Sequence, residues 1–117
     1  MDLRDLIIAL MSYDAVAARQ WVTDAMSLPI QWSRVARPQG VRDEELAVAA
    51  GVVELLAQRM GQPPPLWTRD VGPSPTRLYL VRAAESMPRL RALCEREGPE
   101  PLRKRHILAP PEFLTVV

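Results

Sequence analysis

The side chains most suited to chemistry gather in the stretch Arg103–Leu114, which reads RKRHILAPPEFL. It holds the single histidine, His106, and the single phenylalanine, Phe113. Three basic residues directly precede the histidine: Arg103, Lys104 and Arg105. A histidine acting as a general base needs a nucleophile within reach and an orienting partner, and the chain offers no second histidine. Because neighbouring positive charge disfavours the imidazolium, we interpret His106 as a boundary residue with a half-buried ring and not as a base.

The other reactive groups have structural explanations. Cys94 is the only cysteine, which excludes an internal disulfide and a Cys/His zinc cluster. It falls on the apolar face of a predicted helix, where a core thiol is expected. The paired acids Glu44 and Glu45, and Asp2 with Asp5, stand at predicted helix starts, where capping and the helix dipole favour them. We therefore predict a protein that is not an enzyme and that carries no cofactor and no metal.

Charge is unevenly distributed along the chain, although the net charge is only +1. Residues 1–76 carry seven arginines against nine Asp/Glu, whereas residues 77–106 carry eight Arg/Lys against four Glu. The basic third predicts a contact with an acidic protein surface or, as the alternative, with nucleic-acid phosphates. Simple solvated charge is the third interpretation. The candidate contact residues in this region are Arg89, Arg96, Arg103, Lys104, Arg105 and His106.

The elements that must position these residues are predicted to be helical. With 117 residues, 48% apolar and 25% charged, the chain suits one globular domain spanning residues 1–117. Apolar residues at helical spacing predict helices at 3–10, 18–26, 43–60, 75–84 and 86–97, with a short last turn at 100–105. No alternating strand pattern, phosphate-binding loop or repeat is found. We predict an all-α fold, a compact single-domain helical bundle of about five helices with Pro-rich connections.

The central helix, residues 43–60, gives the strongest signal. Asp43 is its expected N-cap, and Gly61 is expected just beyond its end. Apolar residues cover most of its circumference, so we expect it to be buried. Gly51 weakens such a helix by about 1 kcal/mol relative to alanine, and close packing against a neighbour is the expected compensation. Farther along, Ser74-Pro75 and Ser86 are expected to start the next two helices.

The first apolar run is too short for a membrane span, and acidic residues precede it, unlike in a signal peptide. We therefore expect a cytoplasmic protein with no membrane partner. At the other end, Phe113 and Leu114 belong to an apolar tail. An apolar tail is expected to dock either on its own core or on a partner subunit.

Two segments resemble the C-terminal, non-DNA-binding region of small bacterial antitoxin-like proteins paired with nucleotidyltransferase-type toxins. The first is the small-residue-rich helix 46–57, LAVAAGVVELLA, followed by Pro65-Leu66-Trp67. The second is the basic-then-apolar run 102–108, LRKRHIL. The resemblance extends over residues 43–114. In that family a helix-turn-helix usually precedes this region, and residues 1–40 show none, so the resemblance implies partner binding without DNA autoregulation.

Together these features predict a non-catalytic protein-interaction module, antitoxin-like in character, that binds a partner protein or itself. The implied partner is a toxin-type nucleotidyltransferase, and a homo-oligomer is the other form of the same prediction. Nucleic-acid binding through the basic C-terminal third is kept as the alternative. The candidate contacts are the basic residues named above together with Phe113 and Leu114.

Overall fold

The computed structural model of the protein describes residues 2–115, and helices dominate them. The α-helices are α1 (Leu3–Met11), α2 (Ala15–Ser27), α3 (Asp43–Arg59), α4 (Pro88–Glu97) and α5 (Glu100–Arg103). Three 3₁₀ turns lie between them: η1 (Trp32–Arg34), η2 (Leu66–Asp70) and η3 (Arg82–Glu85). Two strands of two residues each complete the described chain: β1 (Leu78–Tyr79) and β2 (Ile107–Leu108). The prediction of an all-α fold is confirmed.

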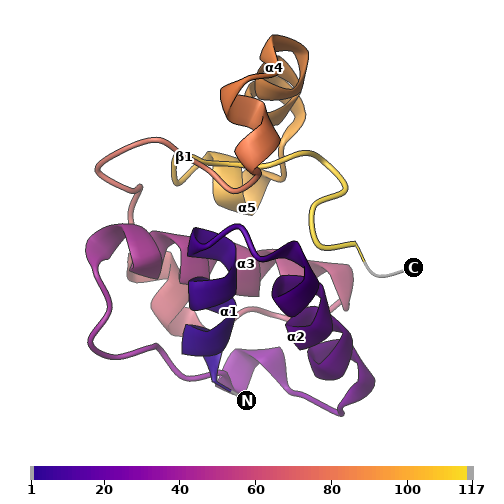
Figure 1. Cartoon of the computed structure of the whole chain (residues 1–117). Coiled ribbons are helices and arrows are strands. Elements are labelled where there is room, and N and C mark those ends of the chain that lie inside the picture. Colours follow the sequence, from indigo (N-terminus) through magenta and orange to yellow (C-terminus); the bar gives the residue numbers. More distant parts are fainter. Residues whose placement is uncertain (1, 116–117) are drawn as a thin grey trace.

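Helix α3 lies at the centre of the arrangement (Figure 1). Helices α1 and α2 pack against each other, and α1 also contacts α3. The C-terminal third covers another side of α3 through α5 and β2. Helix α4 packs mainly on η3 and lies farthest from the α1–α2 pair (Figure 1). The α carbons have a radius of gyration of 13.2 Å, which is close to the ~13 Å expected of a compact domain of this size.

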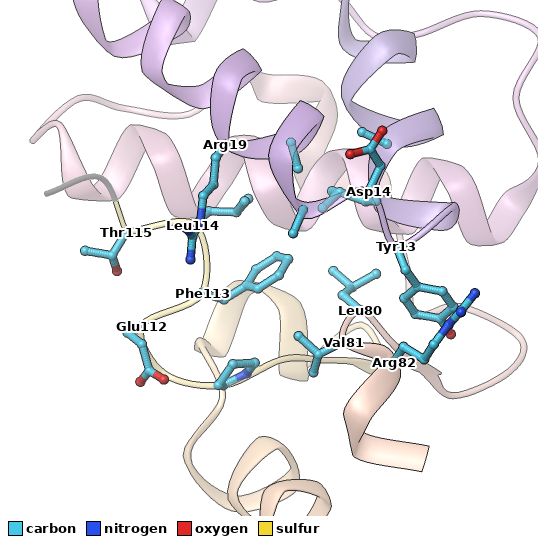
Figure 2. Close-up of a pocket in the computed structure, with 15 residues that line it drawn as sticks. Tyr13, Asp14, Arg19, Leu80, Val81, Arg82, Glu112, Phe113, Leu114 and Thr115 are labelled. Carbon is cyan, nitrogen blue, oxygen red and sulfur yellow. The ribbon is translucent and has the colours of Figure 1, made fainter. Parts of the chain in front are cut away.

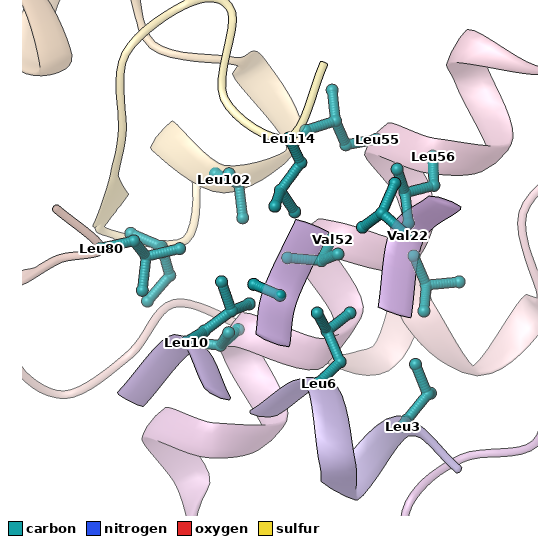
Figure 3. Packing of buried hydrophobic residues seen from close by; sticks show 14 of the residues in the cluster. Leu3, Leu6, Leu10, Val22, Val52, Leu55, Leu56, Leu80, Leu102 and Leu114 are labelled. Atoms are coloured by element: carbon teal, nitrogen blue, oxygen red, sulfur yellow. The ribbon is translucent and has the colours of Figure 1, made fainter. Parts of the chain in front are cut away.

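The hydrophobic core joins α1, α2, η1, α5 and β2 around α3 (Figure 3). Leu6 and Leu10 enter it from α1, and Val22 enters it from α2. Leu102 of α5 and Leu114 approach from the C-terminal third. Trp32 is only 1% exposed, which places this tryptophan firmly inside. The apolar stripes predicted for the first three helices are therefore the buried faces of those helices.

The turn between α1 and α2 is formed by Tyr13 and Asp14. Tyr13 has a φ of +58°, the left-handed region that side chains rarely adopt. The Asp14 carboxylate accepts a hydrogen bond from the Ala17 N–H at 3.0 Å, which caps α2. The structure ends α1 at Met11, close to the predicted end of this helix.

Helix α3 is buried along ten of its 17 residues, as its pattern predicts. Its start differs by one residue from the prediction, because Asp43 is the first helical residue and Arg42 is the N-cap. The Glu45 carboxylate accepts from the Arg42 N–H at 2.9 Å, so an acid inside the first turn caps the helix. Gly61 has a φ of +66° just beyond the end, as expected of a residue at C′.

The predicted helix over residues 75–84 is wrong. Residues 78–79 instead form β1, which pairs in parallel with β2, and a 3₁₀ turn follows. The Leu78 N–H donates to the His106 carbonyl at 3.0 Å, and the Leu80 N–H donates to the Leu108 carbonyl at 2.9 Å. The helical spacing of apolar residues at 78–84 reflects local sequence alone. Pairing with a segment about thirty residues away overrides this local preference.

The N-cap of helix α4 lies one residue later than predicted. Met87 and not Ser86 is the N-cap, with Pro88 as the first helical residue, a position at which proline loses no hydrogen bond. Gly98 ends the helix as predicted. Among residues 2–115, no helix combines the length and apolar character that crossing a membrane requires.

Candidate functional site

The basic cluster around His106 does not form one surface. Arg105 is 3% exposed, which corrects its assignment to an exposed basic face. Its guanidinium donates to the carbonyls of Thr68 and Pro101, each at 2.8 Å, and to the Glu54 carboxylate at 2.5 Å. A buried charge must be paired and hydrogen-bonded, and these partners meet that requirement. Arg105 therefore joins α5 to α3 and η2 inside the protein.

Lys104 reaches the same carboxylate from the surface. Its ammonium lies 3.0 Å from the second carboxylate oxygen of Glu54. Burial raises the pKa of Glu54, but the hydrogen bonds from Arg105 and Lys104 outweigh burial and hold that pKa below its ordinary value. Lys104 and Arg105, both predicted contact residues, are therefore paired with the Glu54 carboxylate.

His106 is exposed, and its ring is not half buried as expected. Its backbone has a φ of +63° and leads directly into β2. The ring Nδ1 lies 3.3 Å from the Ser74 carbonyl, and the backbone carbonyl of His106 accepts from Leu78. These contacts join the start of β2 to the neighbouring segment. The partner of the ring nitrogen is a backbone carbonyl and not a nucleophilic side chain.

Three of the predicted arginines do gather near α4. Arg89 and Arg96 are seven residues apart, almost two full turns, so they project from the same face of α4. Arg103 donates a hydrogen bond to the Arg96 carbonyl. Within residues 2–115 none of these three guanidinium groups has a carboxylate partner within ion-pair distance. We call Arg89, Arg96 and Arg103 the α4 arginine face.

The tail segment, residues 109–115, docks on its own chain. Leu114 is 8% exposed and belongs to the core cluster, while Phe113 is half-buried against it. The Arg59 guanidinium at the end of α3 donates to the Phe113 carbonyl at 2.6 Å and to the Pro111 carbonyl at 3.3 Å. Of the two docking modes expected from the sequence, the structure shows the first for these residues.

Phe113 also lines a cleft of about 290 Å³ between the tail segment, the α1–α2 turn and residues 80–82. In Figure 2 its ring points into the space between Leu80, Val81 and the side of α2 that bears Arg19. We call this feature the tail cleft. Its lining consists of Ala9, Leu10, Tyr13, Asp14, Ala15, Ala18, Arg19, Leu80, Val81, Arg82, Pro110, Glu112, Phe113, Leu114 and Thr115.

Charges of both signs border the tail cleft. Asp14 and Glu112 are acidic, and Arg19 and Arg82 are basic, and all four side chains are exposed. The Arg82 guanidinium carbon lies 5.2 Å from the centre of the Tyr13 ring, a cation–π distance. Burial and the neighbouring Glu85 carboxylate, which accepts from the Tyr13 hydroxyl at 3.3 Å, raise the pKa of Tyr13. Tyr13 therefore stays neutral at physiological pH, with its ring fixed beside the cleft.

Two further groups with chemical potential lie elsewhere. Cys94 is buried in α4, as predicted, and burial raises the pKa of its thiol. Across the described residues there is no group of three or more His, Cys, Asp or Glu side chains close enough to hold a metal ion. Among the described residues, neither the His106 ring, which contacts the Ser74 backbone carbonyl, nor the buried Cys94 thiol forms a nucleophile–base pair.

Sequence reasoning identified Phe113 but missed the opposite wall of the tail cleft. Tyr13, Asp14, Arg19 and Arg82 come from segments far from the tail in sequence. Only Asp14 gave a usable signal, as a capping residue between two apolar stripes. The position of Arg82 could not be inferred, because its segment was predicted to be helical.

No protein-family model, no curated protein and no solved structure matches this chain.

Proposed function

We propose that this protein is a non-catalytic protein-interaction module that binds its partner through the tail cleft. The observation that carries the proposal is the half-buried Phe113 ring facing an apolar floor, with charges of both signs around it. Aromatic and arginine side chains placed beside a pocket are typical of the residues that dominate protein interfaces.

The size of the cleft favours a side chain over a cofactor. Small-molecule sites usually enclose about 300–1,000 Å³, and this cleft of about 290 Å³ lies at the lower end of that range. Leu80 and Ala18 provide an apolar floor that one or two anchoring side chains of a partner would cover. Such an anchor, buried at the centre of an interface, supplies most of its binding energy.

The rim favours a protein over a polyanion. Asp14 and Glu112 would repel phosphates that Arg19 and Arg82 attract, so the cleft suits a partner segment bearing both signs of charge. Charge complementarity of this kind sets the orientation of a partner more than its affinity.

The resemblance of residues 43–114 to antitoxin-like proteins supplies a specific candidate partner. In the antitoxin-like form of the proposal, the tail cleft receives a segment of a nucleotidyltransferase-type toxin. A second copy of this chain is the other candidate. Co-expression with such a toxin from the same genome, followed by co-purification, distinguishes the two.

A pair of alanines on α2 allows a matched test of the cleft. Ala15 is exposed and lines the cleft, whereas Ala17 is exposed on the same helix and does not line it. We expect Ala15→Arg to abolish capture of the partner from the native host, and Ala17→Arg to leave capture at the wild-type level. Circular dichroism would verify that both variants are folded. Equal capture by both variants, or no protein enriched by the wild type, would overturn the proposal.

Nucleic-acid binding is a second candidate because the α4 arginine face has no carboxylate partner among residues 2–115. Three phosphate contacts would give a steep dependence of affinity on salt, with a slope of about −0.9 per contact for duplex DNA. Under this alternative, the double variant Arg89→Ala/Arg96→Ala makes the slope of log affinity against log salt shallower by about two such contacts. Arg69→Ala removes an exposed arginine elsewhere and leaves that slope unchanged. A duplex that does not bind at low salt would exclude this function.

A further inference from the structure

A second and larger groove lies away from the tail cleft, between the start of α1 and the segment that contains η1. It has a volume of about 770 Å³, and residues 29–39 form much of one wall. Arg4 of α1, Arg34 of η1 and Arg37 line it, and all three side chains are exposed. We call it the arginine groove.

Among residues 2–115, no ion pair accounts for the three arginines, because none of their guanidinium groups forms one. Among the described residues, the only carboxylate in the lining is Asp2, whose Oδ1 accepts from the Arg4 backbone N–H at 2.9 Å to cap α1. The groove therefore has an excess of positive charge that is free to bind an anionic partner.

The groove is rigidly built, and part of its lining is apolar. The Trp67 indole N–H donates to the Val35 carbonyl at 2.8 Å. The backbone N–H of Trp32 donates to the Gln62 side-chain oxygen at 3.0 Å. Both bonds fix the wall that carries Arg34. The Trp21 indole N–H donates to the Asp2 carbonyl at 3.0 Å, which fixes the opposite wall. A wall held in place before binding reduces the entropy lost on binding.

We propose that the arginine groove binds an acidic peptide segment of another protein, with an apolar side chain between its carboxylates. The arginines match the carboxylates, and the half-buried Ile30, Val35 and Trp21 match the apolar side chain. A single-stranded nucleic acid would need exposed aromatic faces on which to stack its bases. Trp32 is 1% exposed, and Trp21 is half-buried with its N–H edge occupied, so the groove offers little such surface.

The test uses fluorescence anisotropy with a labelled peptide that carries an acidic run around one leucine. Two comparison peptides replace the leucine by serine, or the carboxylates by amides. We expect the acidic leucine peptide to bind most tightly and to weaken as salt is added. Arg34→Glu and Arg37→Glu are each expected to weaken binding by about tenfold, since each places a like charge against the peptide.

Arg69→Glu is the matched control, because Arg69 is also exposed and unpaired among the described residues but lies outside the groove. It changes the net charge equally and should leave the affinity within about twofold if the groove, and not the overall charge, recognises the peptide. Ala15→Arg in the tail cleft should retain peptide binding, which separates this inference from the proposed function. Equal losses in Arg69→Glu and Arg34→Glu, or a single-stranded oligonucleotide that binds more tightly than the peptide, would overturn it.

Discussion

At the scale of single residues, Arg105 and Lys104 show how neighbours in sequence acquire different roles. Both contact Glu54, but Arg105 is 3% exposed and the Lys104 side chain is 47% exposed. We expect Arg105→Met to lower the free energy of unfolding by about 3 kcal/mol, because it leaves a partly buried carboxylate short of donors. Lys104→Met removes only an exposed ion pair and should cost less than about 1 kcal/mol. Urea denaturation measures both, and equal losses would contradict this assignment.

The lowered pKa of Glu54 also predicts how stability depends on pH. A carboxylate whose pKa is lower in the folded state stabilises the fold fully above its ordinary value of 4.5, and this contribution disappears as pH falls through the lower folded value. We expect the stability difference between the wild type and Glu54→Gln to be constant near neutral pH and to shrink below about pH 4.5. Taking the difference removes the titration of the other acids. A stability difference that grew on acidification would contradict a lowered pKa of Glu54 in the folded state.

Residue types alone predicted some of these environments and not others. Cys94 was predicted to be buried because cysteine on an apolar helical face usually is. The burial of Arg105 was not predictable, because its distant acceptors come from two separate segments, α3 and the η2 stretch. A run of basic residues has the same appearance in sequence whether it is solvated or internal.

At the scale of elements, the contact between α3 and α5 depends on one glycine. A Cβ added at Gly51 would lie 2.6 Å from Leu102 Cδ2 and 3.1 Å from the Pro101 carbonyl oxygen. The sequence predicted close packing here, and the structure identifies the neighbour. The close approach of α5 to α3 is therefore the compensation for a residue that weakens a helix.

Gly51→Ala tests that contact. Alanine gains about 1 kcal/mol of helix propensity, but overpacking a tight core costs about 1–3 kcal/mol, so we expect a net loss of stability. Leu102→Ala removes the closest atom, and the alanine at 51 should be less harmful in that background. A double-mutant cycle by thermal unfolding measures the coupling. Additive effects would show that the two side chains do not compete for space.

The β1–β2 pair shows where element prediction failed. Helices α1, α2 and α3 carry their own capping residues and apolar stripes, so local sequence was sufficient to predict them. β1 exists because of hydrogen bonds to residues 106–108, which local spacing does not encode. The Arg82 side of the tail cleft follows β1, and it was missed for the same reason.

At the scale of the whole molecule, burial is unevenly distributed among the helices. α3 has ten buried residues, whereas Cys94 is the single buried residue of α4. Arg89 and Arg96 of the α4 arginine face therefore stand on the α-helix with the fewest buried residues in the described chain. The arginine groove, by contrast, adjoins the core-packed α1 and the buried Trp32.

This difference predicts two levels of local stability. A region with few buried apolar contacts opens at a lower free energy than the whole domain. We expect the amide hydrogens of α4 to exchange through local opening that depends little on denaturant. The amides of α3 should exchange only through global unfolding, with a free energy equal to that measured by urea denaturation. Native-state hydrogen exchange at increasing denaturant resolves the two classes, and Arg105→Met should lower the protection of α3 by its full loss of stability. If α4 and α3 shared one free energy and one denaturant dependence, α4 would be as firmly part of the cooperative core as α3.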